Sequence, residues 1–400
     1  MWAQDRGSRV IVVSASPRDR RRRCFARVPC ALAVALLAST AAAADDHSPA
    51  ADDARPLFRS APPSEPPARW SLSAETILLG RSGASHQLLV SLVPGNVPWL
   101  TLTGANTTNT PGVEVLNSSQ LGQRLAAGAR LSLAYRAPSG YGLALSYVGV
   151  PGLKAVRSTG PEMPAQWLVM KAPGSFWQTQ DYSYQSMVWR DDTRLHSLEA
   201  EARLELSQRT TLSLGVRWLQ LRDQLQGTLT PDDLGEPAWK LLGAVTLPNA
   251  VPLANSAVVV NPPFWTTTTM NNLYGIQVGA RSELWQNGRL SVEGVIKAGL
   301  YDNRSRQTTL VSMAKQLFPA SAATSAATFV AEGGVVAKYR LTGSVTLKLG
   351  VDALWFDGVA LAPAQIQKVS TTPTSVSASG VDHRGSTLFR GMSFGLDYAF

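Results

Sequence analysis

The feature that most constrains the fold of this chain is an alternation of apolar and polar residues at every second position. It is clearest at residues 198–206. There the apolar residues are Leu198, Ala200, Ala202, Leu204 and Leu206, and the charged residues are Glu199, Glu201, Arg203 and Glu205. Successive side chains of a β-strand point to opposite faces, so this pattern predicts a strand with one apolar and one charged face.

The same alternation recurs from Trp70 to Phe400 and predicts about ten strands, with twelve as an alternative. The connections are of two kinds that alternate along the chain. Four are tight turns near residues 138, 208, 287 and 342, and five are long segments near residues 80–122, 150–194, 223–271, 302–327 and 357–384. Short periplasmic turns and long external loops are typical of outer-membrane barrels. The sequence therefore predicts an all-β, transmembrane antiparallel β-barrel over residues 70–400.

Aromatic residues of the apolar face fall at two levels along the predicted strands. At the turn side these are Trp70, Tyr135, Tyr141, Tyr398 and Phe400, and at the loop side Tyr147, Trp218, Tyr274 and Trp355. Phe329 and Tyr339 are ten residues apart on one strand. With a rise of about 3.3 Å per residue and a tilt near 40°, they stand roughly 25 Å apart along the membrane normal, which matches the apolar band of such barrels.

Charged residues on the opposite face of these strands are expected to line the barrel interior, because a charge facing lipid near the midplane costs about 2 to 4 kcal/mol. This inward set comprises Glu75, Arg130, Arg136, Glu199, Glu201, Arg203, Glu205, Arg217, Arg281, Glu283, Glu293, Lys297, Glu332, Lys338, Lys348, Asp352 and Asp397. Barrels of about eight strands are filled by side chains, whereas open channels appear at about 16. Ten strands and mixed charges favour a plugged or very narrow lumen; a polar channel for small solutes is the alternative.

The N-terminal residues predict export. Residues 1–44 hold eight arginines, two aspartates, the apolar run 28–37 and small residues before Asp45, as in a cleaved signal peptide. Removing them leaves a net charge of +3 from the formal +9, which takes away the main support for nucleic-acid binding. Both cysteines, Cys24 and Cys30, lie in this leader. Residues 45–69 are acidic, then rich in proline, and read as a periplasmic tail.

The last strand carries a predicted assembly signal. Phe394, Leu396, Tyr398 and the terminal Phe400 share one face. This pattern resembles the C-terminal signal read by the outer-membrane assembly machinery. The expected partners are therefore that machinery, periplasmic chaperones and the lipid of the outer membrane.

Four segments also resemble one family, the planctomycete-type beta-barrel porins, or seventh porin-like group. They are 70–75 (WSLSAE), 214–219 (LGVRWL), 272–280 (NLYGIQVGA) and the closing strand. The resemblance covers most of the chain after the leader and implies an outer-membrane barrel. It adds little about substrate, since the porin label of that family itself follows from the fold.

Two further functions stay open. Surface proteases of the omptin type are ten-stranded barrels with acids and a histidine above the rim, and here Asp191, Asp192, His196, Asp382 and His383 fall near external ends. No omptin pattern surrounds these residues, and we predict neither enzyme activity nor a cofactor or metal. The second alternative is a surface anchor or adhesin-like barrel. Its candidate loops, rich in small and polar residues, are 101–111, 266–271, 321–328 and 370–380.

Overall fold

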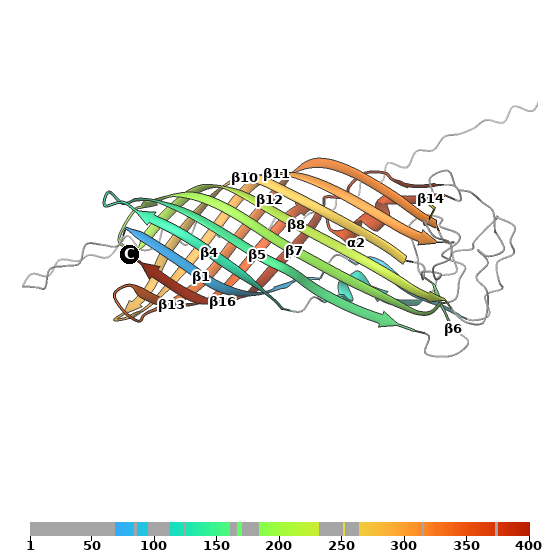
Figure 1. Cartoon of the computed structure of the whole chain (residues 1–400), viewed down its shortest axis with the longest axis horizontal. Helices are drawn as coiled ribbons and strands as arrows, with labels where there is room; N and C mark the ends of the chain where they lie inside the picture. The colour runs from blue at the N-terminus through green and yellow to red at the C-terminus, as the bar shows by residue number, and fades with distance from the viewer. Residues whose placement is uncertain are drawn as a thin grey trace, which may run out of the picture. The chain divides into compact units, whose positions relative to one another are not determined.

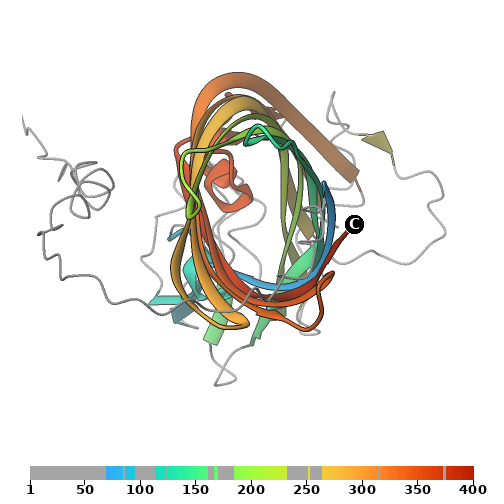
Figure 2. The same ribbon diagram turned by 90° about the vertical axis from the view of Figure 1, so that its left-hand side faces the viewer.

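Ten long strands form a closed antiparallel ring (Figures 1 and 2). The structure is a computed structural model that describes residues 69–83, 86–94, 113–122, 125–160, 166–169, 184–231, 251–252, 264–313, 316–372 and 375–400. The ring strands are β1 (Trp70–Arg81), β4 (Ala126–Arg136), β5 (Tyr141–Thr159), β7 (Tyr184–Glu205), β8 (Thr210–Pro231), β10 (Phe264–Asn287), β11 (Leu290–Met313), β12 (Gln316–Arg340), β13 (Val345–Val359) and β16 (Gly385–Ala399). The predicted antiparallel barrel is confirmed. Within the described ranges, no helix has the length and apolarity needed to cross a membrane.

Several predicted features lie outside the described residues. They are the signal peptide at 1–44, the tail at 45–69 apart from Arg69, and the loop at 101–111.

The stagger of the strands fixes the width of the barrel. Following paired residues once around the ring from Trp70 of β1 leads through Leu388 of β16 to Ser82, twelve residues further along the first strand. Twelve residues of stagger over ten strands correspond to a tilt of about 40° and a backbone diameter near 20 Å. A cylinder of this width is close to the size that side chains fill.

The four tight turns lie where the sequence predicts them, between β4 and β5, β7 and β8, β10 and β11, and β12 and β13. In the first, Gly140 has φ of 82°, and in the third Gly288 of the Asn287-Gly288 pair has φ of 59°. Both values belong to the left-handed region, where glycine avoids the penalty of a Cβ atom.

The barrel extends further toward the loop end than predicted, and the long loop expected at 302–327 is wrong. β11 and β12 stay paired from Leu290 with Tyr339 to Met313 with Gln316. The segments 266–271 and 321–328, expected as loops, belong to β10 and β12. Beyond the apolar band most outward residues are polar or small, as at Thr266, Thr268 and Ser321, so hydrophobic alternation fades although the backbone ladder continues.

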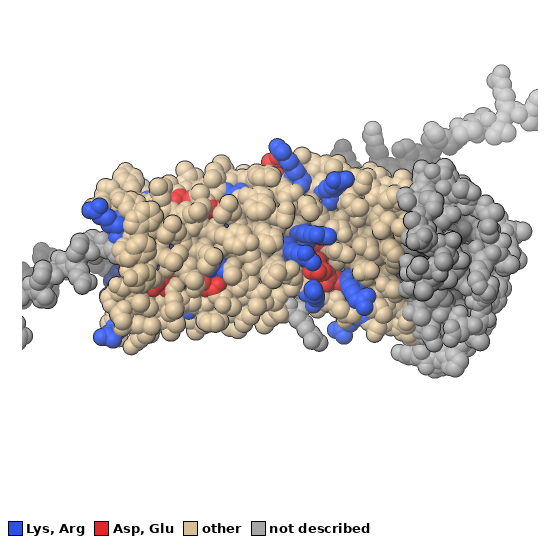
Figure 3. Space-filling view, viewed as in Figure 1, with Lys and Arg blue, Asp and Glu red and all other residues tan. Residues whose placement is uncertain are grey.

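The outer face is apolar between the two aromatic levels. Leu143, Leu145, Ile276 and Leu300 are 50 to 65% exposed, although they are large apolar side chains. The rings of Trp70 and Tyr135 lie 4.9 Å apart at the turn side, and those of Phe329 and Trp355 lie 5.8 Å apart at the loop side. Figure 3 shows this band as a broad surface nearly free of charge.

Smaller elements occupy the loop end. They are β2 (Leu88–Pro94), β3 (Val113–Asn117), the 3-10 turn η3 (Ser118–Gln120), β6 (Gln166–Val169), β9 (Val251–Pro252), α2 (Ala362–Gln365), the 3-10 turn η5 (Ile366–Lys368), β14 (Val369–Thr372) and β15 (Ser375–Ala378). β2 pairs with β3 and β6, and β14 pairs with β15.

Candidate functional site

The turn-side half of the barrel interior holds the predicted inward charges. In β7, Glu199 and Glu201 are buried, whereas Leu198 and Leu204 of the same strand are 43% and 39% exposed. Odd and even residues therefore point to opposite sides of the wall, as the alternation requires.

One group of these charges joins three strands of the barrel, β1, β4 and β13. Glu75 of β1 forms ion pairs with Lys348 of β13 and with Arg130 of β4, the latter at 3.1 Å. Arg130 also reaches Asp352 of β13 at 3.4 Å. The Glu75 side chain is only 5% exposed, so this carboxylate depends on its two cationic partners for stabilisation.

A second group spans the opposite wall. Lys297 of β11 lies 2.7 Å from Glu199 and 2.6 Å from Glu201. Arg217 of β8 pairs with Glu332 of β12 at 2.8 Å and lies 3.7 Å from Glu199. A cavity of about 20 Å³ borders this group next to Arg203, which leaves room for about one water molecule.

The remaining predicted charges pair near the turn-side rim. Arg281 and Lys338 both contact Glu293, at 3.3 Å and 2.6 Å. The other rim pairs are Arg203 with Glu201, Arg136 with Glu205, Arg209 with Glu283, and Lys348 with Asp397. Each of the predicted lumen charges thus has an oppositely charged partner among the described residues. Such pairing fills the interior with neutralised charge.

An apolar layer that the alternation did not reveal lies next along the interior. Its members include Ile77, Leu79, Leu195, Leu219, Leu221, Leu273, Phe356 and Phe389, all at most 5% exposed. The rings of Phe356 and Phe389 meet edge to face at 5.7 Å. The sequence signal for this layer is a local loss of alternation, as at Ile77-Leu78-Leu79, where both faces of the strand are apolar.

On the loop side of the apolar layer, Arg81 and Asp223 form a buried centre that the alternation also did not reveal. Nη1 of Arg81 lies 2.5 Å from Oδ1 of Asp223, and Nη2 donates to Oδ2 at 3.3 Å. Nη1 also donates to the hydroxyl of Thr193 and lies 3.9 Å from Asp191. The guanidinium is 1% exposed and thus enclosed by groups that balance its charge.

This centre holds a segment that folds back into the barrel after β13. The amide of Ala362 donates to Oδ2 of Asp223 at 2.8 Å. Asn271 of β10 accepts from the amide of Ala360 and donates to its carbonyl oxygen, both at 2.8 Å. The orange-red helical turn inside the ring of Figure 2 belongs to this segment.

Three residues within or next to this segment are compatible with its inward course. Gly358 has φ of 90°, and a Cβ atom there would meet the carbonyl oxygen of Ala327 at 3.0 Å. Pro363 lies in the first turn of α2, where its missing amide hydrogen costs no helical bond. Gln365 closes the far side, with its side chain bonded to the amide and carbonyl of Asp382 at 2.8 and 2.7 Å.

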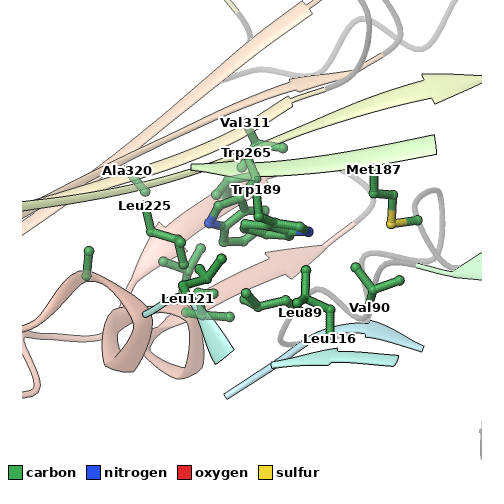
Figure 4. Close-up of a cluster of buried hydrophobic side chains, with 14 of the residues drawn as sticks. Leu89, Val90, Leu116, Leu121, Met187, Trp189, Leu225, Trp265, Val311 and Ala320 are labelled. Atoms are coloured by element: carbon green, nitrogen blue, oxygen red, sulfur yellow. The ribbon is translucent and has the colours of Figure 1, made fainter. Parts of the chain in front are cut away.

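A second apolar cluster lies toward the loop end. Trp189, Leu225 and Trp265 from the barrel wall pack there with Leu89 and Leu121 from the smaller elements (Figure 4). The cluster also includes Ala362 and Ile366 of the inserted segment, so the two are packed together.

The residues considered for an omptin-like site do not form one cluster. Asp191 faces inward toward Arg81, whereas Asp192 pairs with Arg194. His196 contacts the hydroxyl of Tyr147 at 2.9 Å. Asp382 contacts Arg384 at 2.6 Å, and these hydrogen bonds lower the pKa of its carboxyl group below the ordinary value. Among the described residues, no group of three or more His, Cys, Asp or Glu side chains is arranged to hold a metal ion.

The predicted assembly residues lie on the outer face of the closing strand. Phe394, Leu396, Tyr398 and Phe400 are 48 to 57% exposed. The backbone of Phe400 exchanges two hydrogen bonds with Trp70, at 2.9 and 3.1 Å. The first and last residues of the barrel wall are therefore paired.

Comparison with known proteins gives fold likeness only. No family model matches the sequence, and no curated protein matches it. Among solved structures, the outer membrane protease OmpT of Escherichia coli is 10% identical, with a TM-score of 0.43 over 84% of this chain and 97% of that one. The translocator domain of the autotransporter NalP of Neisseria meningitidis is 8% identical, with a TM-score of 0.35 over 83% and 89%. The Pseudomonas putida toluene transporter TodX is 8% identical, with a TM-score of 0.32 over 84% and 91%.

Proposed function

We propose that this protein is an outer-membrane barrel whose lumen is closed by its own side chains and by the inserted segment, and which acts through its loop end. One observation carries the proposal: the barrel buries charge and exposes apolar side chains. Glu199 is 7% exposed and Glu201 4%, whereas Leu143 is 63% exposed and Leu145 50%. Soluble monomers rarely expose so continuous an apolar surface to water, whereas outer-membrane barrels expose such a band to lipid.

Three stacked layers of the interior support the proposal of a closed lumen. The layer nearest the tight turns pairs its charges, and the middle layer is apolar. The layer nearest the loop end fixes residues 358–368 through Asn271 and Asp223. For water to cross the barrel, ion pairs of the charged layer would have to break and the apolar layer would have to be hydrated. Membership of the planctomycete-type porin group, export by the leader and the role of the terminal residues in assembly stay predictions.

The closure is tested by conductance in planar bilayers. We expect the refolded protein to insert without a steady current, and we expect Glu199→Gln to behave in the same way because no permeant ion meets Glu199. A steady current whose ion selectivity changes in this variant would show an open lumen and favour a narrow porin. Peptide hydrolysis that is lost on His383→Ala would favour the hydrolase.

The placement in the membrane is tested separately by labelling intact cells. Ser370 on β14 and Ser207 at a tight turn are both exposed, and each can be changed to cysteine in turn. We expect a membrane-impermeant maleimide to label the protein with Ser370→Cys but not the one with Ser207→Cys. Equal labelling of both would contradict the proposed orientation.

A further inference from the structure

Three arginines lie in one row on the outer face of the barrel. Arg194 of β7 is the direct partner of Arg222 of β8, Arg222 is the partner of Met270 of β10, and Met270 is the partner of Arg306 of β11. All three arginines stand on the outward side of strands whose alternate residues Leu195, Leu221 and Asn303 are buried. We call these three the arginine row.

The row concentrates positive charge that the protein neutralises only in part. Partners on neighbouring strands are about 5 Å apart, so Arg194 and Arg222 repel each other. Asp192 contacts Arg194 at 3.4 Å, but within the described ranges neither Arg222 nor Arg306 forms an ion pair. The neighbouring outward charges are Lys154, Arg190, Arg304 and Asp302. This part of the outer surface therefore carries six cationic side chains and only two carboxylates.

The row lies at a defined depth. Arg222 follows Trp218 by four residues on β8, which places it about 10 Å beyond the upper aromatic level on a strand tilted by about 40°. Arg304, next to the row, lies over the ring of Tyr274 at 5.8 Å. Figure 3 shows Lys and Arg side chains gathered beyond the uncharged band. Aromatic side chains mark the membrane interface, so the row stands at the level of lipid headgroups.

We infer that the arginine row binds the phosphate groups of anionic lipids in the outer leaflet. The inference rests on the proposed position in the membrane. A guanidinium presents paired N–H donors that match phosphate oxygens, and a phosphate between Arg194 and Arg222 would replace their repulsion by two attractions. The spacing favours a row of headgroups over a single small anion.

The test compares the unfolding midpoint of the refolded full-length chain in vesicles of phosphatidylcholine, with and without phosphatidylglycerol as a minor component. We expect the anionic lipid to raise the midpoint of the wild type and to lose most of this effect in the triple variant Arg194→Gln, Arg222→Gln, Arg306→Gln. Each arginine near the surface contributes about five-fold in lipid association. In phosphatidylcholine alone the variant should be at least as stable as the wild type, because the repulsion is gone.

The matched control removes the same charge at the other rim, with Arg209→Gln, Arg289→Gln and Arg340→Gln in the three exposed turn arginines. We expect this control to keep the response to phosphatidylglycerol, and inorganic phosphate to have no effect on any of the proteins. Equal loss in both triple variants, or instability of the row variant in phosphatidylcholine alone, would overturn the inference. A wild type that fails to insert into either vesicle would instead contradict the proposed membrane location.

Discussion

Arg81 of β1 and Asp223 of β8 are joined by two contacts inside the barrel although 142 residues separate them in sequence. The pair ties opposite parts of the wall together, and Asp223 in addition accepts from the amide of Ala362. A single carboxylate thus links the wall to the segment that fills the lumen.

Breaking this pair should destabilise the barrel strongly. Arg81→Met leaves the buried carboxylate of Asp223 without its cation, which costs about 3 to 5 kcal/mol. The double variant Arg81→Met, Asp223→Leu should recover part of that loss, since Asp223 no longer buries an unpaired charge; Asp191, 3.9 Å from Arg81, still loses that cation, so the recovery should be incomplete. Arg136→Met, which removes an arginine that is 62% exposed, should cost less than about 1 kcal/mol. Denaturant unfolding in detergent micelles measures all three; equal losses in Arg81→Met and Arg136→Met would contradict the assignment.

The sequence was sufficient for the wall of the barrel because lipid imposes one rule on every strand. Leu198 is apolar and Glu199 is charged, and this difference alone predicts that Leu198 lies on the outer face and Glu199 on the inner face. The interior beyond the charges follows no such rule. Leu219 and Leu221 face inward although they are apolar, and Arg81 and Asp223 come together only through the stagger of the ring. The inward course of residues 358–368 depends on contacts of Asn271 and Asp223 that no local pattern encodes.

A charge on the outer face should be costly only between the aromatic levels. Leu145 of β5 is 50% exposed in the middle of the apolar band, and Leu206 at a tight turn is 58% exposed. We expect Leu145→Arg to cost about 2 to 4 kcal/mol in vesicles and Leu206→Arg about 0 to 1 kcal/mol. Both sites are similarly exposed, so solvent exposure alone predicts equal effects. Equal unfolding free energies of the two variants would therefore argue against lipid around Leu145.

The inserted segment should depend on Gln365 more than on the charge of Asp382. Gln365→Ala removes two hydrogen bonds to the backbone of Asp382 and should make amide hydrogen exchange in residues 361–368 roughly ten-fold faster. The pKa of Asp382 is lowered by Arg384, so the stabilisation is present above the ordinary aspartate pKa and is lost as pH falls through the lowered one. Because Arg384 is 79% exposed, solvent screens this contribution.

We therefore expect hydrogen exchange of residues 361–368, corrected for its intrinsic pH dependence, to stay constant between neutral pH and about pH 5, and to rise only slightly in stronger acid. Asp382→Asn should resemble the wild type throughout this range. A large change near neutral pH would show that another titrating group holds the segment.

The terminal side chain should matter more for assembly than for stability. Phe400 is 57% exposed on the outer face, and its backbone is bonded to Trp70, which closes the ring. Phe400→Ala keeps both backbone hydrogen bonds and removes only a half-buried ring, so an assembled barrel should lose no more than about 1.5 to 3 kcal/mol. If the assembly machinery reads this residue, the amount of folded protein in the outer membrane should fall much further than that loss explains.

Tyr339→Ala is the matched control, because Tyr339 is an outward aromatic residue at the same rim and is 42% exposed. Heat-modifiable protein in isolated membranes measures assembly, and unfolding of the purified barrels measures stability. Wild-type levels of Phe400→Ala in the membrane, or equal depletion of the two variants, would show that Phe400 is not an assembly signal, whereas the ring of ten strands does not depend on that role.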